Sequence, residues 1–234
     1  IEFKCDMPDW IPEKSLISRA VSLLRETTGY SKGAIIEIKK RIPLVSGLGG
    51  DSSDAAATLH GLNQLWNLGL SRDELLNLAS QLGSDVAFFL YGGTALVEGR
   101  GEKVTPLPPL PPMWVVLIVP PLPRLPGKTE RLYSSLKPSH YTEGEVTNRL
   151  AAWLTEGREV TPSMLFNTFE NVAFTKLSEL KVYRDHIVKI GAREVHLAGS
   201  GPALFTLIKD KSEAEELHIR LQQQGLESYL TDTL

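Results

Sequence analysis

The sequence predicts an α+β protein that consists of two lobes. Segments in which apolar residues recur at helical spacing alternate along the chain with short β-rich runs. Between residues 106 and 126, nine of twenty-one residues are proline, which interrupts regular structure. We therefore place the lobe boundary near residue 108, with an N-terminal lobe over residues 1–108 and a C-terminal lobe over residues 109–234.

The N-terminal half alternates short strands with helices. Apolar residues recur at helical spacing from Leu16 to Leu24, and again after a glycine-rich turn that precedes Ala55. Ser71 to Glu74 matches a capping box, which predicts the start of a further helix. β-rich runs predict strands at 1–4 and 34–40 and a hairpin around 94–98. The sequence identifies no sheet neighbour for the first of these strands.

The C-terminal half is mainly helical after one buried strand, Trp114 to Val119. The predicted helices cover 129–136, 145–155, 162–177 and 181–190. Two strands, 194–198 and 203–208, flank a Gly-Ser-Gly turn. Ser212 with Glu215 predicts the cap of a last helix, and a strand follows at 228–231. A hairpin within this alternation is typical of a ferredoxin-like lobe.

Composition and charge exclude several classes of function. The 234 residues are 42% hydrophobic with a net charge of −3, and Lys and Arg form no basic groove, so we expect no nucleic-acid partner. The longest apolar run, 114–121, is too short to span a bilayer, so we expect no membrane partner. Cys5 is the single cysteine, which excludes an internal disulfide and fits a reducing compartment. The five histidines have no ligand spacing that would predict zinc.

One glycine-rich segment indicates phosphate binding. Residues 43–57 read Pro-Leu-Val-Ser-Gly-Leu-Gly-Gly-Asp-Ser-Ser-Asp-Ala-Ala-Ala, between a β run and a periodic helix. Glycines let backbone N–H groups converge on an anion, and the helix start adds unpaired N–H groups and a partial positive charge. The hydroxyls of Ser52 and Ser53 suit phosphate oxygens or Mg²⁺. The segment has neither the Walker nor the dinucleotide pattern. From the residues alone, a plain turn with a serine cap remains the alternative.

This segment resembles the central motif of the GHMP kinases, a family that includes galactokinase and the homoserine and mevalonate kinases. Its doubled glycine, its Ser-Ser-Asp-Ala-Ala ending and the run Leu-Asn-Gln-Leu-Trp-Asn-Leu-Gly-Leu-Ser at 62–71 are similar to one branch, which acts on a cytidine diphosphate-linked methylerythritol. The resemblance implies a two-lobed fold, with an N-terminal lobe related to the ribosomal protein S5 domain 2-like fold and a ferredoxin-like C-terminal lobe. It also implies that the segment binds the phosphates of ATP with Mg²⁺. The implied phosphate-binding residues are Pro43, Gly47, Leu48, Gly49, Gly50, Asp51, Ser52 and Ser53.

A second motif is Gly83-Ser84-Asp85-Val86, which precedes an apolar run. From the residues alone, Asp85 is an N-cap ahead of a helix. In the family that the chain resembles, this aspartate lies beside the hydroxyl that receives the γ-phosphate. The resemblance therefore implies that Asp85 is catalytic, because a carboxylate there can accept the hydroxyl proton.

Three weaker features complete the candidate site. Gly199-Ser200-Gly201 resembles a C-terminal glycine motif that closes the family's active site near phosphates and acceptor, although a plain hairpin is the alternative. Tyr133 falls where the family that the chain resembles places an aromatic residue that stacks on cytosine. A tyrosine in the helix core is the alternative. Lys40 precedes the phosphate loop and is a weaker nucleotide-binding candidate, the alternative being a solvated lysine at a strand end. No metal ligand is assigned.

The sequence departs from the family pattern in two places. Asp51 stands where the family often has glycine, so its carboxylate must point away from the polyphosphate or share a cation. The family's opening strand carries a lysine that assists catalysis, followed by a Tyr-His pair that binds the acceptor, and the sequence has no counterpart of these residues. We therefore expect an N-terminally incomplete kinase that binds ATP weakly.

The resemblance implies a reaction as well as a fold. The γ-phosphoryl group of ATP would pass to the 2-hydroxyl of the cytidine diphosphate-linked methylerythritol, in the non-mevalonate route to isoprenoid precursors. The expected location is the bacterial cytoplasm or the plastid stroma. Two alternatives stay open: another GHMP kinase of the homoserine or mevalonate type, and a non-catalytic ligand-binding module with this fold.

Overall fold

The computed structural model describes residues 1–8, 10–123, 125 and 127–234. Its contacts divide the chain into two compact units: unit 1 is Ile1–Leu44 with Gly49–Pro106, and unit 2 is Val45–Leu48 with Leu107–Leu234. The lobe boundary near residue 108 stays a prediction about functional domains. The sequence prediction did not separate Val45–Leu48 from its neighbours, because the grouping of these residues comes from contacts with distant parts of the chain.

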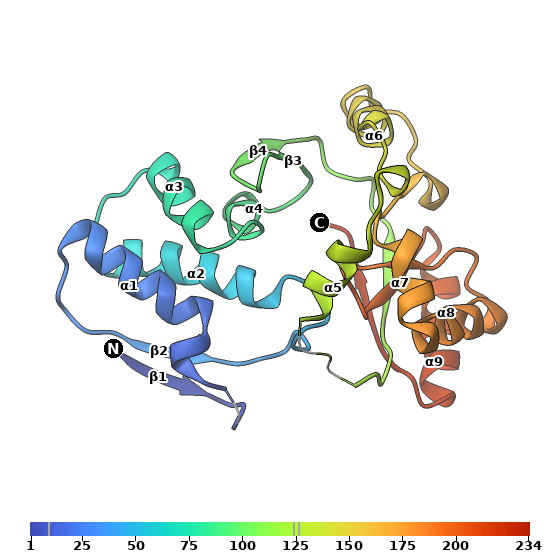
Figure 1. The fold of residues 1–234 in the computed structure, drawn as a ribbon, viewed down its shortest axis with the longest axis horizontal. Coiled ribbons are helices and arrows are strands. Elements are labelled where there is room, and N and C mark those ends of the chain that lie inside the picture. The colour runs from blue at the N-terminus through green and yellow to red at the C-terminus, as the bar shows by residue number, and fades with distance from the viewer. Residues whose placement is uncertain (9, 124, 126) are drawn as a thin grey trace. The chain divides into compact units, whose positions relative to one another are not determined.

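Unit 1 packs helices beside two small sheets (Figure 1). Its strands are β1 (Glu2–Cys5), β2 (Ile35–Ile38), β3 (Ala95–Glu98) and β4 (Lys103–Pro106). Its helices are η1 (Pro12–Lys14), α1 (Leu16–Thr28), α2 (Gly50–Leu65), α3 (Arg72–Leu82) and α4 (Val86–Tyr91). β1 pairs with β2 in parallel across the α1 crossover, which corrects the expectation that the first strand has no neighbour. β3 and β4 form the predicted hairpin.

Local signals fix the helices of unit 1. The side chain of Ser15 accepts the N–H of Ile17 at the start of α1, and Gly29 ends that helix in the left-handed region. The predicted capping box of α3 is confirmed, with Ser71 and Glu74 bonding to each other's backbone N–H groups. The four helices share one apolar core with buried residues from each of them: Ala20, Val21, Leu24, Ala55, Ala56, Leu59, Leu62, Trp66, Leu75, Leu78, Ala79, Leu82, Val86 and Ala87.

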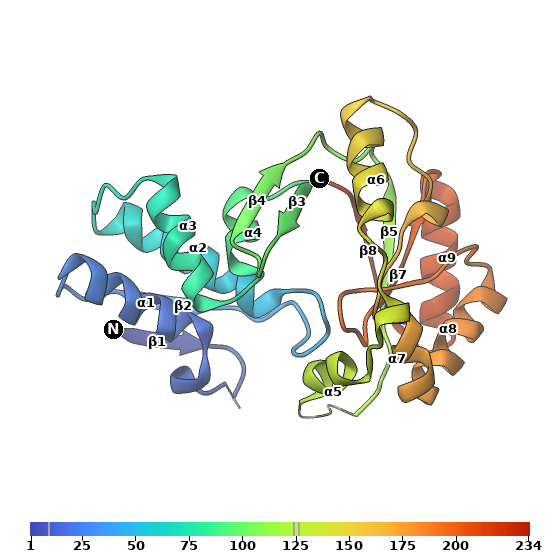
Figure 2. The ribbon, with the colours of Figure 1, turned by 45° about the horizontal axis from the view of Figure 1, so that its top comes forward.

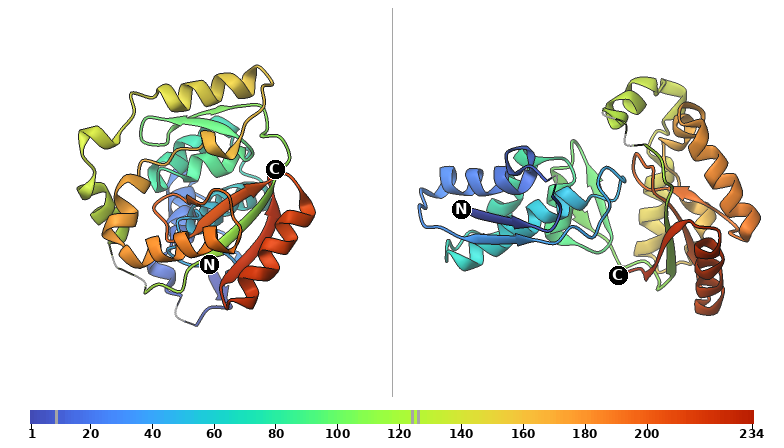
Figure 3. Two further views of the ribbon diagram at one scale, coloured as in Figure 1. Left: turned by 90° about the vertical axis from the view of Figure 1, so that its right-hand side faces the viewer. Right: turned by 90° about the horizontal axis from the view of Figure 1, so that it is seen from below.

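Unit 2 is built on an antiparallel sheet of order β6-β7-β5-β8 (Figure 2). Its strands are β5 (Trp114–Val119), β6 (His196–Leu197), β7 (Leu204–Ile208) and β8 (Glu227–Asp232). Its helices are α5 (Lys128–Ser135), η2 (Pro138–His140), α6 (Glu145–Thr155), η3 (Pro162–Met164), α7 (Glu170–Lys176), α8 (Ser178–Ile190) and α9 (Lys211–Gln223). α8 and α9 lie on one side of the sheet, where they bury its core (Figure 3). Among the described residues, no helix combines the length and apolar character needed to cross a membrane.

Two predictions in unit 2 are wrong in detail. The helix predicted over 162–177 is a short 3-10 turn and then α7, because the Asn167 side chain accepts the N–H of Phe169 at 3.0 Å between them and competes with the helical pattern. The cap of α9 is Asp210 rather than Ser212, since the Asp210 carboxylate accepts the N–H of Glu213 at 2.8 Å.

Candidate active site

The start of α2 is shaped by glycines rather than capped by a serine. Gly49 is the N-cap, in the left-handed region with φ 69°, and no side chain caps the helix. A Cβ on Gly49 would lie 2.7 Å from the ring of Phe89, which packs here from α4. The serine cap of the alternative left open by the sequence is therefore wrong, and the phosphate-binding role of this turn stays a prediction. The first N–H groups of a sixteen-residue helix remain available to an anion at this end.

Lys40 and Asp51 are bound to each other at the first turn of α2. The Lys40 ammonium lies 2.6 Å from Asp51 Oδ1 and 2.6 Å from Asp54 Oδ2, and its side chain is only 5% exposed. Burial lowers the pKa of Lys40, but the hydrogen bonds to both carboxylates outweigh it and hold that pKa above its usual value. The solvated-lysine alternative is wrong. Asp51 is 61% exposed and shares this cation, which is one of the two arrangements expected for an aspartate in the predicted phosphate-binding segment.

Asp85 occupies the N-cap position of α4 without acting as a cap. Its side chain accepts no capping hydrogen bond, its backbone is αR, and the residue is exposed. Gly101 allows the β3–β4 turn to approach the backbone of the neighbouring Ser84, where any Cβ would collide with the Ser84 carbonyl. Asp85 therefore presents a carboxylate that the folding of α4 does not use. Its catalytic role stays a prediction.

Residues 45–48 contact the C-terminal glycine motif within unit 2. The N–H of Ala203 donates to the Ser46 carbonyl at 3.1 Å. A Cβ on Gly199 would lie 2.9 Å from the carbonyl oxygen of Gly47, so both backbones need their glycines. The Gly-Ser-Gly turn does join two paired strands, β6 and β7, as a hairpin would. It also brings together two motifs that are about 150 residues apart in the sequence.

Helix α5 contacts the same turn through Thr129. The hydroxyls of Thr129 and Ser200 are 2.9 Å apart. Tyr133, one helical turn after Thr129, is 58% exposed, so the core-tyrosine alternative is wrong. Its ring packs edge-on against Phe169 with 4.8 Å between centroids. This pair leaves an exposed aromatic ring near the glycine motif.

Sequence reasoning missed two residues that hold this turn. Asn167 Nδ2 donates to the carbonyls of Leu197 and Gly199, both at 2.8 Å. Glu170 Oε1 accepts the N–H of Leu197 at 2.7 Å and lies 3.6 Å from His196 Nδ1. The sequence around them, Asn-Thr-Phe-Glu, sits inside an apparently helical run, and only the polar residues that interrupt its apolar spacing could have marked it.

The predicted site residues fall into both units. Lys40, Pro43, Gly49 to Ser53 and Asp85 belong to unit 1, whereas Gly47, Leu48, Tyr133 and Gly199 to Gly201 belong to unit 2. Within unit 1, Lys40 and the start of α2 are in contact, and α4 packs on α2.

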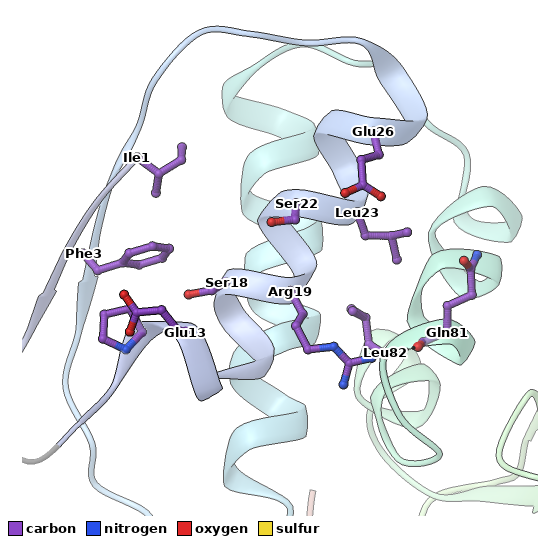
Figure 4. A pocket seen from close by; sticks show the side chains of 11 residues that line it. Ile1, Phe3, Glu13, Ser18, Arg19, Ser22, Leu23, Glu26, Gln81 and Leu82 are labelled. Carbon is purple, nitrogen blue, oxygen red and sulfur yellow. Dashed lines mark hydrogen bonds between the residues drawn. The ribbon is translucent and has the colours of Figure 1, made fainter.

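Two cavities of unit 1 differ in their relation to these residues. One of about 700 Å³ lies between β1, α1 and the end of α3, and Figure 4 shows Arg19 and Phe3 among the side chains around it. None of the predicted site residues lines it. A second, of about 400 Å³, lies between β2 and α2 and includes Asp54, the partner of Lys40.

Comparison with known families identifies the class of this protein. The family model for the N-terminal domain of GHMP kinases matches residues 15–93, and the model for their C-terminal domain matches residues 149–225. The chain therefore belongs to the GHMP kinases, and the predicted fold class is confirmed.

Individual relatives show to which branch of the GHMP kinases the chain belongs. A 4-diphosphocytidyl-2-C-methyl-D-erythritol kinase of Dehalococcoides mccartyi is 49% identical over 234 residues, covering all of this chain and 82% of the relative. One from a Geobacillus species is 39% identical over 88% of this chain and 70% of the relative. Within the GHMP kinases the chain falls among the 4-diphosphocytidyl-2-C-methyl-D-erythritol kinases, and it is a small-molecule kinase for which the family implies ATP as a substrate.

Solved structures agree with this placement. The crystal structure of a 4-(cytidine 5'-diphospho)-2C-methyl-D-erythritol kinase has a TM-score of 0.79 and 33% identity, over 99% of this chain and 82% of the other. A homoserine kinase from Cytophaga hutchinsonii has a TM-score of 0.69 at 20% identity, covering all of this chain and 81% of the other, and shares the fold.

Proposed function

We propose that this protein transfers the γ-phosphoryl group of ATP to the 2-hydroxyl of 4-diphosphocytidyl-2-C-methyl-D-erythritol. The observation that carries the proposal is the contact between residues 45–48 and the turn at 199–201, because these residues belong to the predicted phosphate-binding motif and to the glycine motif predicted to close the site near the acceptor. The names and identities of the relatives support the choice of acceptor over homoserine or mevalonate.

The start of α2 is proposed to bind the ATP phosphates. Its glycines expose backbone N–H groups at the positive end of the helix dipole, and Ser53 adds a hydroxyl. The groove of about 400 Å³ between β2 and α2 runs along α2 from Asp54 to Leu65 and is lined by apolar side chains such as Ile17, Ile36 and Ala57. A planar purine suits such a groove, so we place the nucleotide base there.

Mg²⁺ is proposed as the counter-ion of the phosphates. In the part of the chain that the structure describes, no cluster of three or more His, Cys, Asp or Glu residues could hold a metal ion. Phosphate oxygens would therefore supply most of its ligands, as is usual for Mg²⁺ bound with a nucleotide. The Ser53 hydroxyl donates to the Gly50 carbonyl at 2.8 Å, which leaves its oxygen lone pairs available to the ion. The bound ion would neutralise charge on the transferred group.

On the acceptor side, the exposed Tyr133 ring suits stacking against cytosine, with Thr129 and Ser200 offering hydroxyls nearby. Asp85 would accept the proton of the 2-hydroxyl as that oxygen attacks the γ-phosphorus. The bond from the γ-phosphorus to the bridging oxygen breaks, and ADP leaves with the bond electrons. The proton then passes from Asp85 to solvent.

A panel of acceptors with labelled ATP tests this proposal. We expect phosphorylation of the cytidine diphosphate-linked methylerythritol and at most trace phosphorylation of homoserine or mevalonate. Preference for either of the latter would reassign the acceptor. Phosphorylation of none, although Mg-ATP binds, would favour a non-catalytic module.

A variant that fills the groove tests the position of the base. Ala57 is exposed and lines the groove, so Ala57→Phe should weaken Mg-ATP binding by about tenfold or more without disturbing the core. His60→Phe places the same ring at an exposed position of α2 that does not line the groove and serves as control. Equal ATP affinity in both variants would show that the nucleotide base does not bind in this groove.

A further inference from the structure

Lys128, the first residue of α5, is a buried lysine whose ammonium group has more hydrogen-bond donors than acceptors around it in the described residues. Its relative exposure is 6%, and its ammonium donates one long hydrogen bond of 3.4 Å to the Val45 carbonyl. An ammonium has three donors, and burying donors that lack acceptors is costly. No carboxylate of the described residues lies within salt-bridge distance of it.

Three features of this position disfavour a positive charge in the unbound protein. The amine is removed from water, it has no anionic partner among the described residues, and it lies at the N-terminal end of a helix, where the dipole favours anions. Burial lowers the pKa of Lys128 to about 8. The nearby carboxylates do not compensate: Glu130 follows on the same helix, Glu170 of α7 is bonded to Leu197, and residues 45–48 carry no titratable side chain.

The Lys128 ammonium lies next to residues 45–48, which belong to the predicted phosphate-binding segment. Val45 has a φ of 58°, a left-handed conformation that is a genuine outlier for a β-branched residue. Gly47, two residues later, also has positive φ and contacts the turn at 199–201. Such strain persists when surrounding contacts fix it, and it is concentrated at functional sites. Lys128 is one of those contacts.

We propose that Lys128 is a phosphate-binding residue of the kinase, whose ammonium holds the Val45 carbonyl in the free protein and binds a nucleotide phosphate oxygen when ATP is present. The inference rests on the proposed function, because ATP is the proposed phosphoryl donor and its phosphates are the anion that would bind the Lys128 ammonium. An oxyanion satisfies the amine better than one distant carbonyl, and it suits the helix terminus as well. In the free protein the lysine is a cost to stability, and in the complex it contributes affinity.

The sign of the change in stability when Lys128 is replaced distinguishes a phosphate-binding role from a structural one. Replacing a lysine that only supports the fold would destabilise the free protein. Lys128→Met removes a buried charge, so we expect a higher melting temperature without ligand and an Mg-ATP affinity lower by about tenfold or more. Lys176→Met is the matched control, because this exposed lysine lies at the C-terminal end of α7, where the helix dipole favours a cation. The control should lower the melting temperature slightly and leave ATP affinity unchanged.

Proton uptake provides a second readout that does not depend on the stability of a variant. An oxyanion beside the amine raises its proton affinity, so Mg-ATP binding at pH 8.5 should take up a fraction of a proton per site. Calorimetry in buffers of different ionisation enthalpy measures this number. We expect uptake in the wild type and in Lys176→Met, and its loss in Lys128→Met. Equal uptake and equal affinity in wild type and Lys128→Met would overturn the proposal. If the wild type itself does not bind Mg-ATP, the proposed function fails first.

Discussion

Gly47 lies so close to Gly201 that a methyl group on Gly47 would be 2.8 Å from the Gly201 nitrogen, and it would also collide with the carbonyl oxygen of Ala198. Both glycines have positive φ, 84° and 68°. The approach of the two backbones is therefore possible only without side chains. It fixes residues 45–48 of the predicted phosphate-binding segment against the C-terminal glycine motif.

Gly47→Ala should therefore loosen this contact. We expect a cost of about 1–3 kcal/mol from the left-handed backbone and the collision, together with a lower affinity for Mg-ATP. Gly61→Ala is the control for stability alone, because Gly61 lies inside α2 with nothing within 4 Å of an added Cβ. Its Mg-ATP affinity is not compared, since Gly61 lines the groove between β2 and α2. This control should stabilise the protein by about 0.5–1 kcal/mol. Denaturant unfolding and calorimetry measure both quantities, and an unaltered stability and affinity in Gly47→Ala would contradict the close approach.

Ser53→Ala should weaken Mg-ATP binding by about 1–3 kcal/mol, the range for losing a hydrogen bond to a charged group. Among the described residues, the Ser53 hydroxyl bonds to one partner, the carbonyl of Gly50 in its own helix turn, so the fold should survive the change. Titration calorimetry measures the affinity, and the circular dichroism spectrum confirms the fold. An affinity equal to that of the wild type would remove this hydroxyl from the phosphate site.

Asp85→Asn should lower kcat by about 10²–10⁴-fold and leave Mg-ATP affinity nearly unchanged, because the carboxylate acts on the acceptor. The structure adds a second expectation. Since the Asp85 side chain caps no helix, the melting temperature should hardly move. Steady-state kinetics and thermal unfolding of the same preparation test both statements. A large fall in stability with normal turnover would make Asp85 a structural residue.

The sequence allowed the elements and the glycine motifs to be predicted, because these depend on local periodicity, capping and turn chemistry. The α3 capping box and the β3–β4 hairpin are examples in which neighbouring residues carry the whole signal. Lys128 and Asn167 could not be predicted in this way. Their partners are the carbonyls of Val45, Leu197 and Gly199, and a backbone carbonyl has no sequence signature. The pairing of Lys40 with Asp51 was predicted only in part. The sequence required that Asp51 point away from the polyphosphate or share a cation, but it did not identify Lys40 as that cation.

The pair of Glu170 and His196 gives a pH dependence with a defined sign. The Glu170 carboxylate accepts a hydrogen bond from the His196 ring, and this interaction, opposed in part by burial, raises the pKa of His196. Charge attraction to Glu170 and Glu194 adds to the effect. A raised pKa means that the pair contributes its full stability below the ordinary imidazole value, about 6.5, and loses it as pH rises through the higher folded value.

Glu170→Gln isolates this charge, because its amide oxygen can still accept the Leu197 N–H. We expect this variant to be less stable than the wild type by roughly 0.5–1 kcal/mol at pH 5.5, and nearly as stable at pH 9, where His196 is neutral in both. Glu170→Ala also loses the hydrogen bond to Leu197, so it should be less stable at both pH values. Denaturant midpoints at the two pH values decide the matter, with Glu194→Gln as the comparison, since its carboxylate is 3.8 Å from the ring and more exposed. A deficit in Glu170→Gln that is the same at pH 5.5 and pH 9 would show that Glu170 supports the glycine turn through its hydrogen bond alone.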